Sequence, residues 1–368
     1  MKTTQSDLLE LILPGLCIAP LLQKDLDDAQ AHLDDLTKPQ GSLGRLEDLA
    51  QRLYAMSGGH APISVSPAIM LTVAGDHGVA DQGVSPFPKA VTRQMVQNFF
   101  NNGAGVNVLC KTSGMDLRVV DAGCDGGPYE PHPILIERRL GDGTADMSQG
   151  PAMNRETCLK GLRMGVELAH QLADEGYRCL GAGEMGIANS TAGTALYCAL
   201  LHFDPEQMTG PGAGANPDMV RHKTEIVRRA LAANASILEE DDPINVLAAL
   251  GGFEIVVMAG LMLGAASRRL PVLVDGFICS AAYVAALHIC PQLADYAVLS
   301  HASAEPGHVR ALSKLTGGET RNNPLLHLSM RLGEGTGGAV AYHLLRCAAS
   351  VYNDMATFSS AGVAGKTC

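Results

Sequence analysis

The chain has 368 residues, of which 46% are hydrophobic and 18% are charged, and this is enough apolar material for a large buried core. A formal net charge of −11, an aromatic content of 4% and the absence of tryptophan argue against nucleic acid or an anionic membrane as a partner. No signal-peptide pattern and no apolar run of about 20 residues is present, so we expect a soluble, cytoplasmic protein.

The first 57 residues have a helical pattern. In GSLGRLEDLAQRLYAM, leucines and a methionine recur at steps of three and four residues from Leu43 to Met56. Ser42 stands where the N-cap of such a helix would lie.

The middle of the chain alternates short apolar runs with helical stretches. Helical patterns cover residues 91–113 and 154–176, and the chain turns helical again after residue 325. Such alternation predicts an α/β fold with a mostly parallel sheet and right-handed crossovers. The expected strands are residues 68–75, 116–123, 177–183, 269–276 and 295–301.

Ligands of parallel sheets bind at the carboxyl ends of the strands, so the polar residues that follow the apolar runs are candidates for a site. These residues are Asp76, His77, Asp121, Glu184, Asp275, Ser300 and His301.

Metal binding is an alternative use of some of these groups. Asp76, His77 and Asp81 lie in one loop, but no H-x-x-x-H or H-E-x-x-H pattern accompanies them, so we expect no metal site. The ten cysteines form no C-x-x-C pair and lie mostly in apolar runs. They are best interpreted as small buried hydrophobic residues, with disulfides or a zinc site as the alternatives.

The stretch LGAGEMGIANST (180–191) contains Gly181, Gly183 and Gly186 in the G-x-G-x-x-G pattern of dinucleotide-binding loops, and Asp204 follows at the distance of a ribose-binding acid. Glu184 inside the loop would repel a diphosphate. A second interpretation is that the glycine amides and the following helix hold one phosphate while Glu184 faces a part of the ligand that is not anionic. A purely structural turn is the third.

Two further glycine-rich stretches carry charged residues. TGPGAGANP (209–217) is followed by Lys223 in a predicted helix, an arrangement typical of phosphate binding, although a solvated surface loop fits equally well. LGEGTGGAV (332–340) places Glu334 between two glycines, which allow a flat ligand to approach the carboxylate closely. With apolar walls Glu334 would have a raised pKa and could act as a general base; otherwise it is a solvated surface charge.

Taken together, the chain resembles the nicotinate-nucleotide–dimethylbenzimidazole phosphoribosyltransferases. The resemblance rests on eight stretches in family order: KPQGSLGRLE (38–47), AGDHGVADQGVS (74–85), GTADMSQGPAM (143–153), GAGEMGIANST (181–191), LGGFEI (250–255), PVLVDGF (271–277), SHASAEPGH (300–308) and RLGEGTGGA (331–339).

The resemblance implies a Rossmann-like α/β domain over residues 58–325 and a small helical bundle built from residues 1–57 and 326–368, assembled as a homodimer. It implies transfer of phosphoribose from nicotinate mononucleotide to 5,6-dimethylbenzimidazole or a related base, with no cofactor and no metal. The products would be α-ribazole 5′-phosphate, for the nucleotide loop of cobalamin, and nicotinate.

The resemblance also assigns residues. Glu334 would be the general base and Glu184 would sit beside the reacting centre. The substrate-binding residues it implies are Gly183, Met185, Gly186, Asn189, Ser190, Gly212, Lys223, Ser303 and Leu332. The stretch GVSPFPK (83–89) departs from the family near the base pocket, so the preferred base is open. An NAD-dependent oxidoreductase and a non-catalytic base-binding protein are the competing hypotheses.

Overall fold

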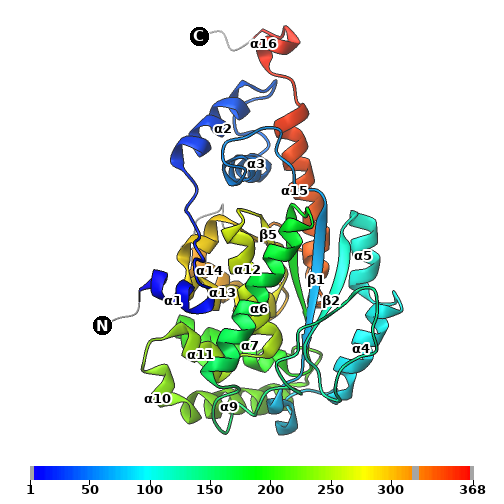
Figure 1. The fold of residues 1–368 in the computed structure, drawn as a ribbon, viewed down its shortest axis with the longest axis vertical. Helices are drawn as coiled ribbons and strands as arrows, with labels where there is room; N and C mark the ends of the chain where they lie inside the picture. Colours follow the sequence, from blue (N-terminus) through cyan, green and yellow to red (C-terminus); the bar gives the residue numbers. More distant parts are fainter. Residues whose placement is uncertain (1–3, 317–322, 365–368) are drawn as a thin grey trace.

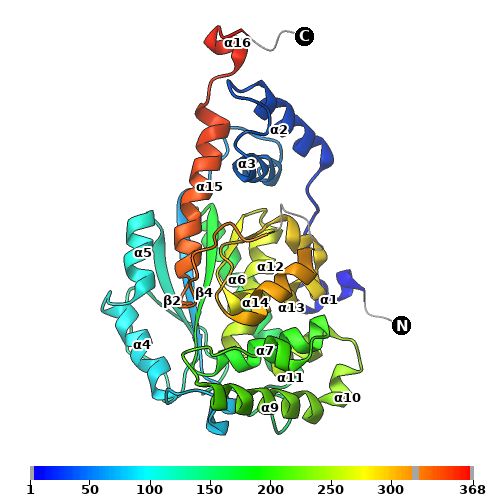
Figure 2. The same ribbon diagram turned by 180° about the vertical axis from the view of Figure 1, so that it is seen from behind.

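The computed structural model describes residues 4–316 and 323–364 of the chain. Within them, six strands form a fully parallel sheet in the order β3-β2-β1-β4-β5-β6 (Figures 1 and 2), which confirms the predicted α/β class. The strands are β1 (Ala68–Gly75), β2 (Asp116–Gly123), β3 (Leu135–Glu137), β4 (Cys179–Met185), β5 (Val272–Val274) and β6 (Ala297–Leu299).

The central strands follow directly from their sequences. All eight residues of β1 are buried, as expected of a strand covered on both faces. Strand β3 was missed by the sequence analysis because it has three residues at the edge of the sheet, none of them fully buried. Strands β5 and β6 are shorter than predicted, with three residues each.

Helices cover both faces of the sheet. The connections from β1 to β2 and from β4 to β5 run in opposite directions along the sheet. Because such crossovers are almost always right-handed, α4 (Ala90–Phe100) and α5 (Gly105–Ser113) lie on one face and α12 (Phe253–Ser267) lies on the other. Helix α12 is buried against β1 and β4 and is covered in turn by α6. The helices are α1 (Gln5–Ile12), α2 (Gln23–Asp35), α3 (Arg45–Met56), α4 (Ala90–Phe100), α5 (Gly105–Ser113), α6 (Arg155–Asp174), α7 (Asn189–Leu201), α8 (Pro205–Met208), α9 (Pro217–Ala233), α10 (Ala235–Leu238), α11 (Pro243–Leu250), α12 (Phe253–Ser267), α13 (Phe277–Ile289), α14 (Pro306–Thr316), α15 (Thr336–Asp354) and α16 (Phe358–Ala361), with short 3-10 helices at Gly78–Gln82 and Pro291–Asp295.

Segments from both ends of the chain pack together beside the sheet. Helix α3 contacts both α2 and α15, and Figure 1 shows these helices at the end of the molecule opposite α9 and α10. Helix α1 instead contacts α6 and α13. The division into a helical bundle and an α/β domain at residues 57/58 and 325/326 stays a prediction.

Some local predictions were wrong. Helix α3 begins after Gly44, whose φ of 53° is left-handed, so Ser42 is not its N-cap. The stretch 91–113 is two helices rather than one, because Asn102 adopts a φ of 58° and Gly103 follows it. In the described part of the chain nine cysteines are free thiols, and seven of them are buried. No described helix has the length and apolar character needed to cross a bilayer.

The strand order fixes where a ligand site belongs. The chain moves outward from β1 to β2 and β3 and then returns to β4 on the other side of β1. The carboxyl ends of β1 and β4 therefore form the topological switch point, where loops diverge and leave a crevice.

Candidate functional site

A cavity of about 700 Å³ lies at this switch point. Its walls come from the segment after β1, the end of β4, the start of α7, and the loops after β5 and β6, together with the loop that precedes α15. Glu184 and Glu334, which are 150 positions apart in sequence, both line it. Of the substrate-binding residues implied by the resemblance, the cavity wall contains Met185, Gly186, Asn189, Ser190, Gly212, Ser303 and Leu332.

Glu334 is held in an unusual backbone conformation. Its φ is 64°, in the left-handed region that disfavours residues with a Cβ, and glycines with positive φ flank it on both sides. Its carbonyl accepts a hydrogen bond of 2.7 Å from the Thr72 hydroxyl on β1, and its N–H donates to the Glu184 carbonyl at 3.2 Å. Asp275, after β5, accepts hydrogen bonds from the N–H groups of Gly335 and Gly338. Three strands thus fix the position of Glu334.

The Glu334 side chain is buried, with 5% of its surface exposed. Oε2 accepts a hydrogen bond of 3.0 Å from the N–H of Val106 in the first turn of α5. Burial raises the pKa of Glu334, and the nearby Asp275 raises it further, while the amides of Val106 and Gly105 oppose the shift. Oε2 is therefore anchored, and no described residue donates a hydrogen bond to Oε1.

Glu184 lies across the same cavity at the end of β4. Its Oε2 accepts a hydrogen bond from the side-chain amide of Asn189 in α7. Burial raises the pKa of Glu184 to about 8, the Asn189 hydrogen bond opposes the shift, and Asp275, Glu254 and Glu334 add to it. A pKa of about 8 favours the protonated form of Glu184 at neutral pH.

The glycines of LGAGEMG serve protein packing rather than a diphosphate. A Cβ at Gly181 would overlap the side chain of Met70, one at Gly183 would overlap the Glu334 carbonyl, and one at Gly186 would overlap the Gly75 carbonyl. Gly183 accordingly lies beneath the Glu334 loop and does not line the cavity.

The acid of the dinucleotide interpretation is engaged elsewhere. The Asp204 side chain is exposed, accepts a hydrogen bond from the N–H of Glu206 and caps α8. Together with the packing of the three glycines, this argues against the dinucleotide interpretation of the motif.

The polar end of the cavity is formed by Ser190 and the glycine loop around Gly212. Helix α7 begins at Asn189 after Ala188, and no side chain caps its N-terminal amides. Lys223 is fully buried behind this wall and does not line the cavity itself. Its ammonium donates to Ser190 Oγ at 2.8 Å and to the Gly210 carbonyl at 3.3 Å. Burial lowers the pKa of Lys223 to about 8, and Glu305 opposes the shift.

Apolar side chains form much of the rest of the cavity wall. They include Val84, Phe87, Val91, Met95, Met185, Ile187 and Leu332. Two of these side chains remain substantially exposed, Phe87 at 48% and Leu332 at 62%. Apolar walls with a few polar groups at one end are typical of sites for flat organic ligands.

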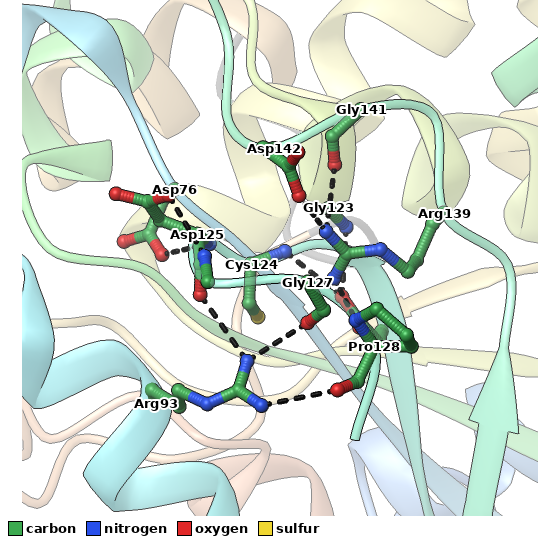
Figure 3. Close-up of polar contacts among 12 residues, drawn as sticks. Asp76, Arg93, Gly123, Cys124, Asp125, Gly127, Pro128, Arg139, Gly141 and Asp142 are labelled. Atoms are coloured by element: carbon green, nitrogen blue, oxygen red, sulfur yellow. Dashed lines mark hydrogen bonds and ion pairs between the residues drawn. The ribbon is translucent and has the colours of Figure 1, made fainter.

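Two of the strand-end acids have structural roles outside the cavity. Asp76 accepts a hydrogen bond of 2.8 Å from the N–H of Asp125 (Figure 3). Asp121 forms an ion pair of 2.7 Å with Arg139. The Arg93 guanidinium donates to the carbonyls of Asp125, Gly127 and Pro128. These contacts fasten the loop after β2 to β1 and to α4.

The loop that suggested a metal site has other partners as well. His77 Nε2 lies 2.8 Å from Glu254 Oε1 in a buried pair, and Asp81 pairs with Lys89 at 2.7 Å. Among residues 4–316 and 323–364, no three side chains of the His, Cys, Asp or Glu type converge in a way that could hold a metal ion.

Some cavity residues were missed by the sequence analysis. Glu305 and Pro211 belong to stretches that the sequence could not distinguish from ordinary turns. Asp275 and His301 were expected near a site only because they follow strands; His301 lines the cavity, and Asp275 lies behind it with an oxygen 3.6 Å from His301 Nε2.

The chain is similar to known phosphoribosyltransferases in sequence and in fold. Residues 18–363 match a family model described as phosphoribosyltransferase. The chain is 58% identical to the nicotinate-nucleotide–dimethylbenzimidazole phosphoribosyltransferase of Nitratidesulfovibrio vulgaris strain DP4, over 94% of this chain and 96% of that protein. It is also 58% identical to the protein of that name from Oleidesulfovibrio alaskensis, over 91% and 92%. The crystal structure of CobT from Thermus thermophilus superposes with a TM-score of 0.86 at 39% identity, covering 93% of this chain and 100% of that one. The chain belongs to the nicotinate-nucleotide–dimethylbenzimidazole phosphoribosyltransferase family.

Proposed function

We propose that the protein transfers the phosphoribosyl group of nicotinate mononucleotide to 5,6-dimethylbenzimidazole or a related base in the cavity at the carboxyl ends of β1 and β4, with Glu334 as general base. The observation that carries this proposal is the placement of Glu184 and Glu334 on one cavity, whose wall also contains polar groups such as Ser190 and several apolar side chains. The names of the relatives support the two substrates.

We place the phosphate of the donor nucleotide at the polar end. The Ser190 hydroxyl and the Gly212 loop can donate hydrogen bonds to phosphate oxygens, and the N-terminus of α7 lies beside them, although the N–H groups of Asn189 and Thr191 already donate to the carbonyls of Gly186 and Ala188. Ser303, on the loop after β6, adds a hydroxyl to the same wall. Lys223 acts through Ser190, because its ammonium holds the Ser190 oxygen and leaves the hydroxyl proton free for a ligand.

We place the acceptor base against the apolar side chains of the wall, which include Phe87, Met95 and Leu332. A benzimidazole is flat and mostly apolar, with one lone-pair nitrogen and one N–H. Because Leu332 and Glu334 belong to the same loop, a base packed on Leu332 lies close to the unengaged Oε1 of Glu334.

The proposed chemistry uses both carboxyl groups. As the lone-pair nitrogen attacks C1′, positive charge grows on the base, its N–H becomes acidic, and Glu334 accepts that proton. The bond from C1′ to the nicotinate nitrogen breaks, and nicotinate leaves with the bonding electrons from the opposite face, so the β configuration becomes α. The positive pyridinium ring and C1′ favour the ionised form of Glu184, which then offsets the charge that develops at C1′.

The experiment is chromatographic analysis of products from nicotinate mononucleotide and a panel of benzimidazoles, purines and phenols. We expect equimolar nicotinate and an α-linked riboside phosphate. Binding of the base without release of nicotinate would support a non-catalytic base-binding protein instead. A change in reduced-nicotinamide absorbance on mixing the protein with NAD and alcohols would support an oxidoreductase.

We also propose that the protein acts as a homodimer. Phe87 and Leu332 remain exposed at the mouth of the cavity, and a second subunit placed over them would remove apolar surface from water. Light scattering coupled to size-exclusion chromatography should give about twice the chain mass, and a monomer at micromolar concentration would contradict the proposal.

A further inference from the structure

Glu305 is a buried carboxylate without a hydrogen-bond partner. Only 6% of its surface is exposed, Oε1 is completely buried, and no described residue donates a hydrogen bond to either carboxylate oxygen. Its own N–H contacts Ser303 Oγ at 3.3 Å, which fixes the backbone but leaves the carboxylate unsatisfied. A buried acceptor without a donor is destabilising, so such a group calls for a partner that binds there.

The position of Glu305 identifies where that partner would lie. Glu305 lines the same cavity as Glu184 and Glu334. Its carboxylate lies against Gly210, where a Cβ would overlap Oε2. At the other end of this short loop, a Cβ at Gly212 would come within 2.7 Å of Ser190 Oγ. The loop from 210 to 212 therefore contacts the Glu305 carboxylate at one end and the Ser190 hydroxyl at the other.

The chemistry of the carboxylate indicates which group of a ligand Glu305 can bind. An ionised carboxylate only accepts hydrogen bonds, and it repels phosphate. It therefore does not bind the phosphate that Ser190 and Lys223 favour. The hydroxyl groups of a ribose are hydrogen-bond donors, and they belong to the same sugar that carries the 5′-phosphate. Acidic side chains commonly bind them.

We propose that Glu305 binds the 2′- and 3′-hydroxyl groups of the nucleotide's ribose, and so selects a ribonucleotide as the donor. This inference rests on the proposed function, because it takes the phosphate to lie at Ser190. Lys223, buried beside the same loop, partly balances the negative charge of Glu305 until the sugar arrives.

The test is a set of dissociation constants measured by calorimetry without acceptor base, so that the reactivity of the glycosidic bond plays no part. The ligands are nicotinate mononucleotide, its 2′-deoxy and 3′-deoxy analogues, and nicotinate riboside, which lacks the phosphate. The proteins are the wild type, Glu305→Gln, which keeps the size of the side chain, and Glu206→Gln as an exposed control beside the same loop.

We expect Glu305→Gln to weaken nicotinate mononucleotide binding by about 10- to 100-fold, as for a lost hydrogen bond to a charged group. The wild type should bind at least one deoxy analogue more weakly than nicotinate mononucleotide, by a similar factor. Glu305→Gln should bind that same analogue and nicotinate mononucleotide with dissociation constants that agree within about twofold. Glu206→Gln should match the wild type throughout. The wild-type measurements test the inference even if the Glu305 variant does not fold.

Three results would overturn the inference. The first is that both deoxy analogues bind the wild type as tightly as nicotinate mononucleotide does. The second is that Glu305→Gln weakens the binding of every nucleotide by the same factor. The loss could also vanish with nicotinate riboside, which would show that Glu305 acts through Lys223 and the phosphate. Product formation by the wild type is measured separately, so nucleotide binding without product would refute the proposed function and leave the assignment of Glu305 standing.

Discussion

Replacement of Glu334 by glutamine tests the proposed general base most directly. Glutamine has nearly the same shape, and its side-chain oxygen can still accept the hydrogen bond from Val106 that now measures 3.0 Å to Oε2. A neutral acceptor makes a weaker hydrogen bond, but burial already disfavours the ionised carboxylate, so we expect the free energy of unfolding to change by no more than about 1 kcal/mol. The amide cannot accept a proton from the base, so kcat should fall by about 10²- to 10⁴-fold.

The assay combines product chromatography with calorimetric measurement of base binding. Affinity for the base should change by less than about threefold, since the apolar wall is intact. Glu137→Gln, an exposed change on β3, serves as the control and should leave both quantities unchanged. If Glu334→Gln retains kcat within about threefold of the wild type, positioning of the two substrates rather than proton transfer governs the reaction.

The remaining predictions concern pH and packing. The value of kcat/KM should rise with pH as Glu334 loses its proton, at a pKa above the ordinary value of a glutamate. It should fall above about pH 8 as the Lys223 ammonium loses a proton. A flat profile from pH 5 to 10 would contradict both assignments. The fold holds a proton on Glu184 up to a pKa of about 8, whereas the unfolded chain releases it near 4.5, so wild-type stability falls between these pH values. Glu184→Gln cannot ionise, and its Tm relative to the wild type should therefore increase from pH 5 to pH 8; a constant difference would show that Glu184 is ionised throughout. Gly183→Ala should lower the free energy of unfolding by about 1–3 kcal/mol, measured by chemical denaturation, and should lower activity, because the added methyl group overlaps the Glu334 carbonyl. Unchanged stability would show that the Glu334 loop can move aside.

The sequence predicted those parts of the fold that depend on continuous burial. Strands β1 and β2 were predicted at their observed limits because each is a single run bounded by glycine. Strand β3 could not be found, since three residues at a sheet edge leave no periodic pattern. The break between α4 and α5 depends on the left-handed Asn102, a conformation that an apolar pattern does not reveal.

For the site, the sequence identified residue types but not distances. Glycines around Glu334 and Glu184 marked both loops, and the structure brings these two carboxyl groups into one cavity. Lys223 was expected at the ligand, yet it lies behind Ser190, because the depth of a side chain in the wall is set by packing between α7 and α9. Glu305 lies in the stretch SHASAEPGH, but nothing in the sequence singled it out from its neighbours; the lack of a hydrogen-bond donor to its Oε1 becomes visible only in three dimensions.

The left-handed backbone at Glu334 sets function against folding at a single position. A residue with a Cβ in this conformation costs about 1–2 kcal/mol, and glycine would relieve the cost. Directed evolution for heat resistance alone should therefore tend to replace this glutamate. The clones that gain the most in melting temperature here would be those that no longer make product.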